Sequence, residues 1–146
     1  MREIKFRIFH DGTMYYLNKG DGLRLCFFSE GIPWGLYESS TDARIVTGDP
    51  DAILNTPGVL MQFTGREDKK GSPIYEGDII ECEYHTQFID KEDPKIWRGV
   101  VEYHESHTHF SVISKGQSYS VGFGGSAVKR WEVIGNIHQN PELLTL

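Results

Sequence analysis

The sequence predicts a mostly β protein in which short strands are joined by tight turns, together with one or two short helices. Aromatic residues, which are enriched in strands, make up 12% of the 146 residues. The 16 glycines are spread along the chain, and Gly supplies the backbone conformations that tight turns need. Two blocks, residues 60–80 and 132–144, read as strand, turn and strand with Gly at the turns.

Composition limits the class of protein. The hydrophobic content of 38% does not count the 16 glycines. With the glycines included, it is near the average of globular proteins, so the chain can bury a core. The length suits one domain. The net charge of −6 argues against a protein whose main task is to coat nucleic acid.

The cysteines and the hydropathy pattern indicate a cytoplasmic protein. Cys26 and Cys82 are far apart and not in CxxC spacing, so a zinc ribbon is excluded and no oxidising compartment is required. The charged N-terminus does not resemble a secretory signal. No apolar run approaches the roughly 18 residues of a membrane span, so we expect no membrane association.

The first half of the chain predicts an N-terminal antiparallel hairpin layer. Residues 3–9 alternate, with Ile4, Phe6 and Ile8 on one face, which is typical of a half-buried strand. Asp11-Gly12 is a preferred type I′ turn pair, so residues 14–17 should return antiparallel.

Further elements follow with less regularity. Residues 23–28 and 59–63 predict strands, whereas residues 29–57 form the least regular stretch. Within that stretch, residues 49–54 have the Asp cap and early Pro of a short helix. Residues 65–73 predict a polar turn.

The second half predicts an SH3-like β-barrel over residues 77–137, because a Gly-Asp pair precedes an Ile-rich strand and a Gly-Val-Val strand follows it. The four predicted strands are residues 78–84, 97–104, 109–113 and 128–137. Residues 85–96 are polar and broken by Pro, which predicts a loop or hairpin tip. Residues 140–142 open a terminal helical turn.

Three segments of the chain resemble the YopX family. They are residues 1–7, residues 60–80 with Tyr75-Glu76-Gly77-Asp78-Ile79-Ile80 at their end, and residues 132–144 with Ile134-Gly135-Asn136-Ile137 at their centre. The resemblance spans nearly the whole chain. It implies a single YopX-like domain over residues 1–146, divided here into an N-terminal β layer (1–76), a barrel (77–137) and a C-terminal tail (138–146).

The resemblance also implies a general role. Proteins of this family are small, mostly β and carried by phages and mobile elements, and the family pattern offers no catalytic residues. It therefore implies a prophage-encoded accessory protein in the cytoplasm of a bacterial host cell, without enzymatic activity and without a cofactor. Its partners would be host or phage proteins, in replication or regulation.

The sharpest chemical candidate is a histidine cluster that consists of His104, Glu105, His107 and His109. In an extended strand, the last three would share one face, and imidazoles two residues apart can bind a divalent metal. However, the segment lies between two predicted strands, and a polar hairpin turn explains it without a metal. We therefore expect the turn and no metal site, and keep a metal-dependent enzyme as an outside alternative.

Three other motifs have structural explanations. Glu76 and Asp78 could form a hydrolytic carboxylate pair, but Gly77 permits a positive φ and Asp78 can accept hydrogen bonds from nearby backbone amides. The Gly-rich residues 122–126 lack the P-loop ending and predict a β-β loop. Cys82 has acidic neighbours, which disfavour a thiolate. We therefore expect no catalytic residues.

A nucleic-acid-binding module is the main alternative function. Positive charge and a stacking ring could come from Lys69, Lys70, Lys129, Arg130 and Trp131. These four basic residues are few beside the 21 acidic residues of the chain. We therefore favour the interpretation that they are ordinary surface residues over a nucleic-acid-binding site.

Finally, the sequence predicts self-association into a closed homo-oligomer. Residues 23–28 carry one charge, and the nearby residues 32–37 add large apolar groups. Exposed strand edges must be blunted or paired, and symmetric association is the common remedy. Phe28 and Trp34 are the candidate interface residues. The competing interpretation is that both segments are buried in the core of the monomer.

Overall fold

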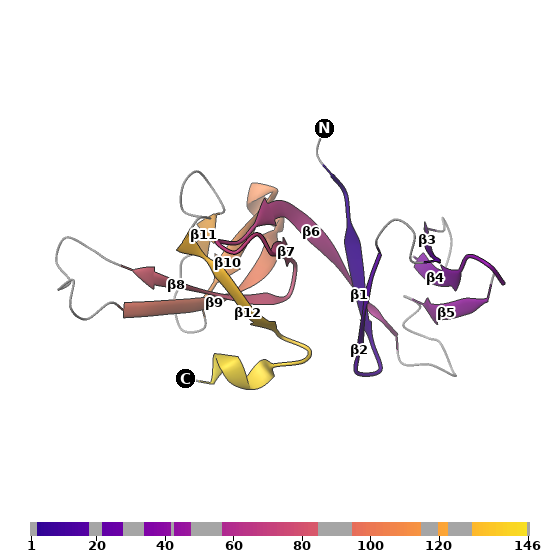
Figure 1. Cartoon of the computed structure of the whole chain (residues 1–146). Helices are drawn as coiled ribbons and strands as arrows, with labels where there is room; N and C mark the ends of the chain where they lie inside the picture. The colour runs from indigo at the N-terminus through magenta and orange to yellow at the C-terminus, as the bar shows by residue number, and fades with distance from the viewer. Residues whose placement is uncertain are drawn as a thin grey trace. The chain divides into compact units, whose positions relative to one another are not determined.

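The computed structural model describes residues 3–17, 22–27, 34–41, 43–47, 57–84, 95–114, 120–122 and 130–145 (Figure 1). Within these ranges the chain forms strands and two short 3-10 turns, which confirms the predicted mostly β class. The predicted helix at residues 49–54, and nearly all of the predicted loop at 85–96, lie outside the described residues. In the part that is described, no helix is long and apolar enough to cross a membrane.

Contacts divide the chain into two compact units. One unit contains residues 3–62 and the other contains residues 63–146, so the boundary falls within strand β6 (Val59–Glu67). The predicted sub-regions 1–76, 77–137 and 138–146 stay a prediction about domain organisation.

The first unit contains the predicted N-terminal hairpin. Strand β1 (Phe6–His10) pairs antiparallel with β2 (Thr13–Tyr16) on one side and with the start of β6 on the other. Asp11 and Gly12 have φ angles of 46° and 77°, and positive φ at both central residues is the mark of a type I′ turn. The prediction from Asp11-Gly12 is confirmed.

A second sheet in this unit corrects the prediction of irregular structure at residues 29–57. Strand β3 (Leu23–Phe27) pairs with β4 (Trp34–Glu38), which pairs with β5 (Arg44–Thr47). The two new strands are only five and four residues long, too short for a clear period-2 pattern. Their strand conformation depends on pairing with β3, which the local sequence does not reveal.

The core of the first unit joins these sheets. Ile8, Leu36 and Val46 are at most 1% exposed, and Trp34 is 8% exposed. Gly58 lies against them, because a Cβ atom there would stand 2.5 Å from Val46 Cγ1. The alternation of residues 3–9 correctly predicts Ile8 as a core residue, whereas Ile4, which precedes β1, is exposed.

The second unit begins with a bulged hairpin. Strand β6 continues to Glu67 and pairs with β7 (Pro73–Tyr75), with a register shift between Phe63 and Glu67. Gly65 lies within this shift and has a φ angle of 83°. This left-handed conformation favours Gly. The predicted turn therefore begins three residues too early, because β6 continues to Glu67.

A five-stranded antiparallel sheet forms the rest of the second unit (Figure 1). Its order is β11 (Ser120–Gly122), β10 (His109–Ile113), β9 (Lys95–His104), β8 (Asp78–Tyr84) and β12 (Glu132–Asn136). The last strand, β12, returns beside the first strand, β8, which is the strand order of SH3-like barrels. The prediction gave β8 and β10 their correct bounds, began the last strand too early and missed β11.

The core of the second unit lies on one face of this sheet. Its buried members are Ile74, Ile80, Val101, Phe110, Val112 and Trp131. The chain ends in the 3-10 turn η3 (Pro141–Leu144), which confirms the predicted terminal helical turn.

Candidate functional site

The two long sequence blocks, residues 60–80 and 132–144, meet in the second unit. The backbone N–H of Ile137 donates to the carbonyl of Gly77 at 2.9 Å, and Asn136 lies opposite Asp78 in the ladder of β12 and β8. We call this region the block junction. It contains five charged side chains with described contacts, which are Asp68, Lys69, Lys70, Asp78 and Glu132.

Asp68 forms the buried part of the block junction. It lies in the turn after β6 and is 7% exposed. Its Oδ1 atom accepts hydrogen bonds from the backbone N–H groups of Lys70 and Ser72, both at 2.8 Å, and its Oδ2 atom accepts one from Val133 at 3.0 Å. Burial alone would raise the pKa of Asp68, but these three backbone hydrogen bonds outweigh it and hold the pKa below its ordinary value.

Glu132 forms a half-buried part of the block junction. Its carboxylate accepts from Lys69 Nζ at 2.7 Å and also forms an ion pair with Lys70 Nζ. Hydrogen bonds from these two ammonium groups hold the pKa of Glu132 below its ordinary value. The backbone of Lys69 adds a hydrogen bond from its N–H to the carbonyl of Trp131 at 2.9 Å. The turn is thus attached to β12 by both backbone and side chains.

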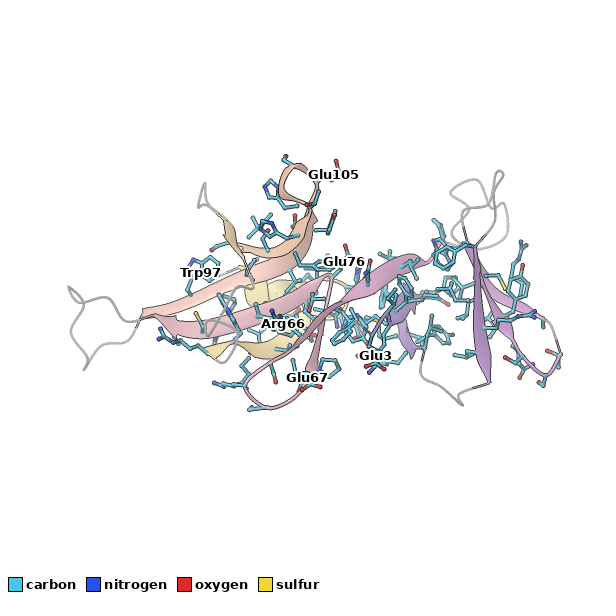
Figure 2. All side chains as sticks on the ribbon, turned by 90° about the horizontal axis from the view of Figure 1, so that it is seen from above. Glu3, Arg66, Glu67, Glu76, Trp97 and Glu105 are labelled. Atoms are coloured by element: carbon cyan, nitrogen blue, oxygen red, sulfur yellow. The ribbon has the colours of Figure 1, made fainter. Side chains whose placement is uncertain are left out.

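Gly77 and Asp78 have the structural roles that the sequence predicts. Gly77 has a φ angle of 76°. Asp78 is 1% exposed, and its Oδ2 atom accepts from the backbone N–H of Tyr75 at 2.7 Å. Glu76, which Figure 2 labels, directly precedes them in the chain. The Asp78 carboxylate is thus used to close the turn into β8.

Arg98 connects β9 to the C-terminal turn. Its Nε and Nη2 atoms donate to Glu81 Oε2 at 3.1 and 2.5 Å, and its Nη1 atom donates to the carbonyl of Leu143 at 2.7 Å. Gly135 permits close packing of the same segment, because a Cβ atom there would stand 2.7 Å from Asn140 Oδ1. One guanidinium group therefore joins the sheet to the end of the chain.

The histidine segment forms the predicted turn. The 3-10 turn η1 (Glu105–His107) connects β9 to β10, and Figure 2 labels Glu105 on this turn. The extended strand that would align Glu105, His107 and His109 does not form. Instead His104 lies opposite His109 in the ladder, and their rings stack at 6.3 Å with an interplanar angle of 18°.

No group of three or more metal-ligating side chains gathers around one point in the described residues. The side chain of His107 lies outside them. The absence of a metal site at this turn stays a prediction.

The structure brings together some of the predicted interaction residues. Lys69, Lys70 and Trp131 meet at the block junction, while Arg130 is exposed at its border. Trp131 is 3% exposed and packs against Trp97 at a ring distance of 5.1 Å. The role of Trp131 as an exposed stacking ring is therefore wrong, because the core of the second unit covers it. Lys129 lies outside the described residues.

The two predicted interface residues of the first unit, Phe28 and Trp34, have different outcomes. Trp34 is a core residue, which favours the competing interpretation for that side chain, and Phe28 lies outside the described residues. The adjacent Phe27 is 61% exposed and contacts Phe6 edge to face at 5.8 Å. Apolar surface is thus present at the end of β3, one residue before the predicted position.

Both thiols are free and half-buried. Burial raises the pKa of Cys82 above its ordinary value, which disfavours the thiolate, in agreement with the prediction of an unreactive thiol.

Sequence reasoning missed Asp68, Arg98 and Glu132. A local signal existed only for Asp68, because an Asp three residues before a Gly is typical of a turn closed by its own side chain. The contacts of Arg98 and Glu132 join segments that are distant in the sequence, so they depend on the tertiary fold.

Comparison with known proteins places this fold in a family. The family model described as YopX protein matches residues 5–145. The structure is similar to protein yopX from Bacillus subtilis, with 29% identity over 99% of each chain and a TM-score of 0.59. It also resembles protein EF1440 from Enterococcus faecalis, with 22% identity over 99% of each chain and a TM-score of 0.57. No curated protein matches the chain.

Proposed function

The chain belongs to the YopX family, and on that premise we propose that it is a prophage-encoded accessory protein that acts through protein contacts rather than catalysis. The polar groups of the second unit support this proposal. Asp68 and Asp78 bind backbone amides, and Arg98 binds Glu81 and a carbonyl group. Each of these groups serves to hold the fold. We place the protein in the bacterial cytoplasm.

The observation that carries the proposal is an apolar strip in the first unit, which we define as the exposed Ile4 and Phe27 and the half-buried Phe6. Ile4 is 67% exposed and Phe27 is 61% exposed, and Phe6 contacts Phe27. Contiguous exposed apolar groups mark protein-interaction surfaces. Phe27 lies on β3, which is an edge strand of its sheet, and edge strands are common places for association.

We propose that this strip binds a host or phage protein and that it also mediates closed homo-oligomerisation. Light scattering behind a sizing column, at micromolar concentrations, tests the second part. The wild-type protein should have a mass above the 16.7 kDa of the chain, and Phe27→Glu should reduce it to that value. Tyr103→Glu is the matched control, because Tyr103 is 45% exposed in the other unit. A wild-type monomer would end the proposal of self-association.

The first part of the proposal, that the strip binds a host or phage protein, requires a search for the partner. Proteins retained from a lysate of the bacterial host by the wild-type protein and by Tyr103→Glu, but not by Phe27→Glu, would support protein recognition by the strip. Equal retention by all three proteins would remove the strip from the proposal.

Nucleic-acid binding is the second candidate function. The side chains of Lys69 and Lys70 are adjacent, and they are 45% and 64% exposed. Retention of DNA or RNA at physiological salt, with an affinity that falls steeply as salt rises, would favour this candidate.

A further inference from the structure

The hairpin of β9 and β10 brings two imidazoles together at its tip. His104 and His109 are register partners, and their rings are nearly parallel at 6.3 Å. Residues that lie directly opposite each other in an antiparallel pair have Cβ atoms about 4.5–5.5 Å apart. Both side chains therefore project from the same face of the hairpin. The local backbone, rather than a long-range contact, sets their distance.

The turn between them restricts the hairpin tip. Thr108 has a φ angle of 52°, and its N–H donates to the carbonyl of Glu105 at 3.3 Å. This left-handed residue closes the 3-10 turn directly before His109. The backbone is thus arranged before any ligand binds, which lowers the entropy lost on binding.

The ring distance is close to that of a metal site with two imidazole ligands. For bond lengths of about 2.0–2.1 Å in tetrahedral geometry, the two ring centres lie roughly 5 Å apart. The observed 6.3 Å between nearly parallel rings exceeds this, so the side chains must rotate to turn one nitrogen of each ring toward a shared ion. His109 is exposed and His104 is half-buried, so the outer imidazole has room to turn.

The surrounding charges favour a cation. Residues 101–114 contain two acidic residues and no Lys or Arg. Glu102 lies two residues before His104 on β9, opposite Ser111, and therefore projects on the same face as the two imidazoles. Glu102 and Glu105 are both exposed. Nearby carboxylates attract a divalent ion and disfavour anions.

From this geometry we infer, against the expectation from the sequence, that His104 and His109 form a two-imidazole binding site for a divalent transition-metal ion such as Zn²⁺. Neutral imidazole is a preferred ligand of this ion class. The remaining coordination positions are open to water or to a ligand from another molecule. The inference is independent of the proposed protein-contact function, because the apolar strip belongs to the other unit.

Calorimetric titration of tag-free protein with Zn²⁺ tests the site. The wild-type protein should bind one ion, and His104→Ala and His109→Ala should each weaken binding by roughly tenfold or more, since even outer-shell changes cost about that much. His10→Ala is the matched control, because His10 lies on β1 in the other unit. It should leave the affinity unchanged.

Two further measurements keep the test decisive. Thermal unfolding without metal should be nearly the same for all four proteins, which shows that the variants fold. Zn²⁺ should raise the unfolding temperature of the wild-type protein and of His10→Ala only. Binding that survives in both hairpin variants, or that is lost in Cys26→Ser or Cys82→Ser, would place the ion elsewhere and overturn the inference. Absence of wild-type binding up to millimolar Zn²⁺ would also overturn it.

Discussion

The Asp68 carboxylate accepts a hydrogen bond from the backbone N–H of Val133 at 3.0 Å, although 65 residues separate the two in the sequence. Val133 lies on β12, which pairs with β8 on its other side. A buried backbone N–H needs a hydrogen-bond partner. In the block junction a side chain from a turn supplies the acceptor that a further strand would otherwise provide.

Asp68→Ala should therefore destabilise the protein. The substitution leaves three backbone N–H groups without their acceptor, and we expect a loss of about 2–4 kcal/mol in the free energy of unfolding. Urea denaturation measures it. Glu67→Ala is the control, because Glu67 is an exposed neighbour and should change stability by no more than about 0.5 kcal/mol. Equal stability of the two variants would contradict the role given to Asp68.

The lowered pKa of Asp68 predicts a pH dependence. Because the folded-state pKa lies below the ordinary value, the ionised carboxylate stabilises the folded protein fully above the unfolded-state pKa of about 3.9. That contribution is lost as the pH falls through the folded-state pKa. The difference in free energy of unfolding between wild type and Asp68→Asn should thus be constant near neutrality and should decrease in acid. Urea denaturation from neutral to acidic pH measures this difference, and a difference that does not change with pH would refute the linkage.

Patterns in the sequence predict those turns that are determined by residues close together in the chain. Asp11 and Gly12 specify their turn because both adopt a positive φ, and Asp78 closes a turn with an amide three residues before it. Gly65 shows the limit of this reasoning. The residue type correctly indicates an unusual φ, but the register of β6 and β7 decides that it forms a bulge rather than the start of the turn.

Features that depend on pairing between distant strands could not be predicted in this way. The short strands β4 and β5 are stabilised by their neighbours, and the third partner of Asp68 lies on a strand far along the chain. The same holds for the histidine pair. The sequence predicts the turn, but only the register shows that His104, rather than His107, lies opposite His109.

The ion pairs of Glu132 predict how the protein responds to polyanions. Glu132→Gln should release Lys69 and Lys70 from their shared carboxylate. The variant should bind single-stranded DNA more tightly than the wild type, with a steeper decrease of affinity with salt, by about 0.7 in slope for each new phosphate contact. Glu102→Gln changes the net charge equally at an exposed position on β9 and serves as the control. The same affinity in both variants would show that overall charge, not the lysine pair, governs the effect.

The contacts of Arg98 predict that it holds the C-terminal turn. Arg98→Lys keeps the charge, but an ammonium group cannot reproduce the paired contacts to Glu81 and to the Leu143 carbonyl. We expect a loss of about 1–3 kcal/mol in stability and faster amide hydrogen exchange in residues 137–145. Arg66→Lys, at an exposed position, should change neither. If amide hydrogen exchange in Arg98→Lys does not change, side-chain packing, including the packing around Gly135, is sufficient to hold the C-terminal turn.

Trp34 and Phe27 are opposite each other in the ladder of β3 and β4, yet they should respond differently to truncation. Trp34 packs in the core, where a Cβ atom on Gly58 would stand 2.9 Å from its Cη2 atom, so Trp34→Ala should cost about 3–5 kcal/mol. Phe27 is 61% exposed, and in the dissociated protein its truncation should cost about 1 kcal/mol or less. Urea denaturation of both variants at concentrations too low for association separates burial within the chain from burial between chains. If the loss for Phe27→Ala matches that for Trp34→Ala under these conditions, the exposed strip belongs to the core of the monomer, and its role in protein contacts fails.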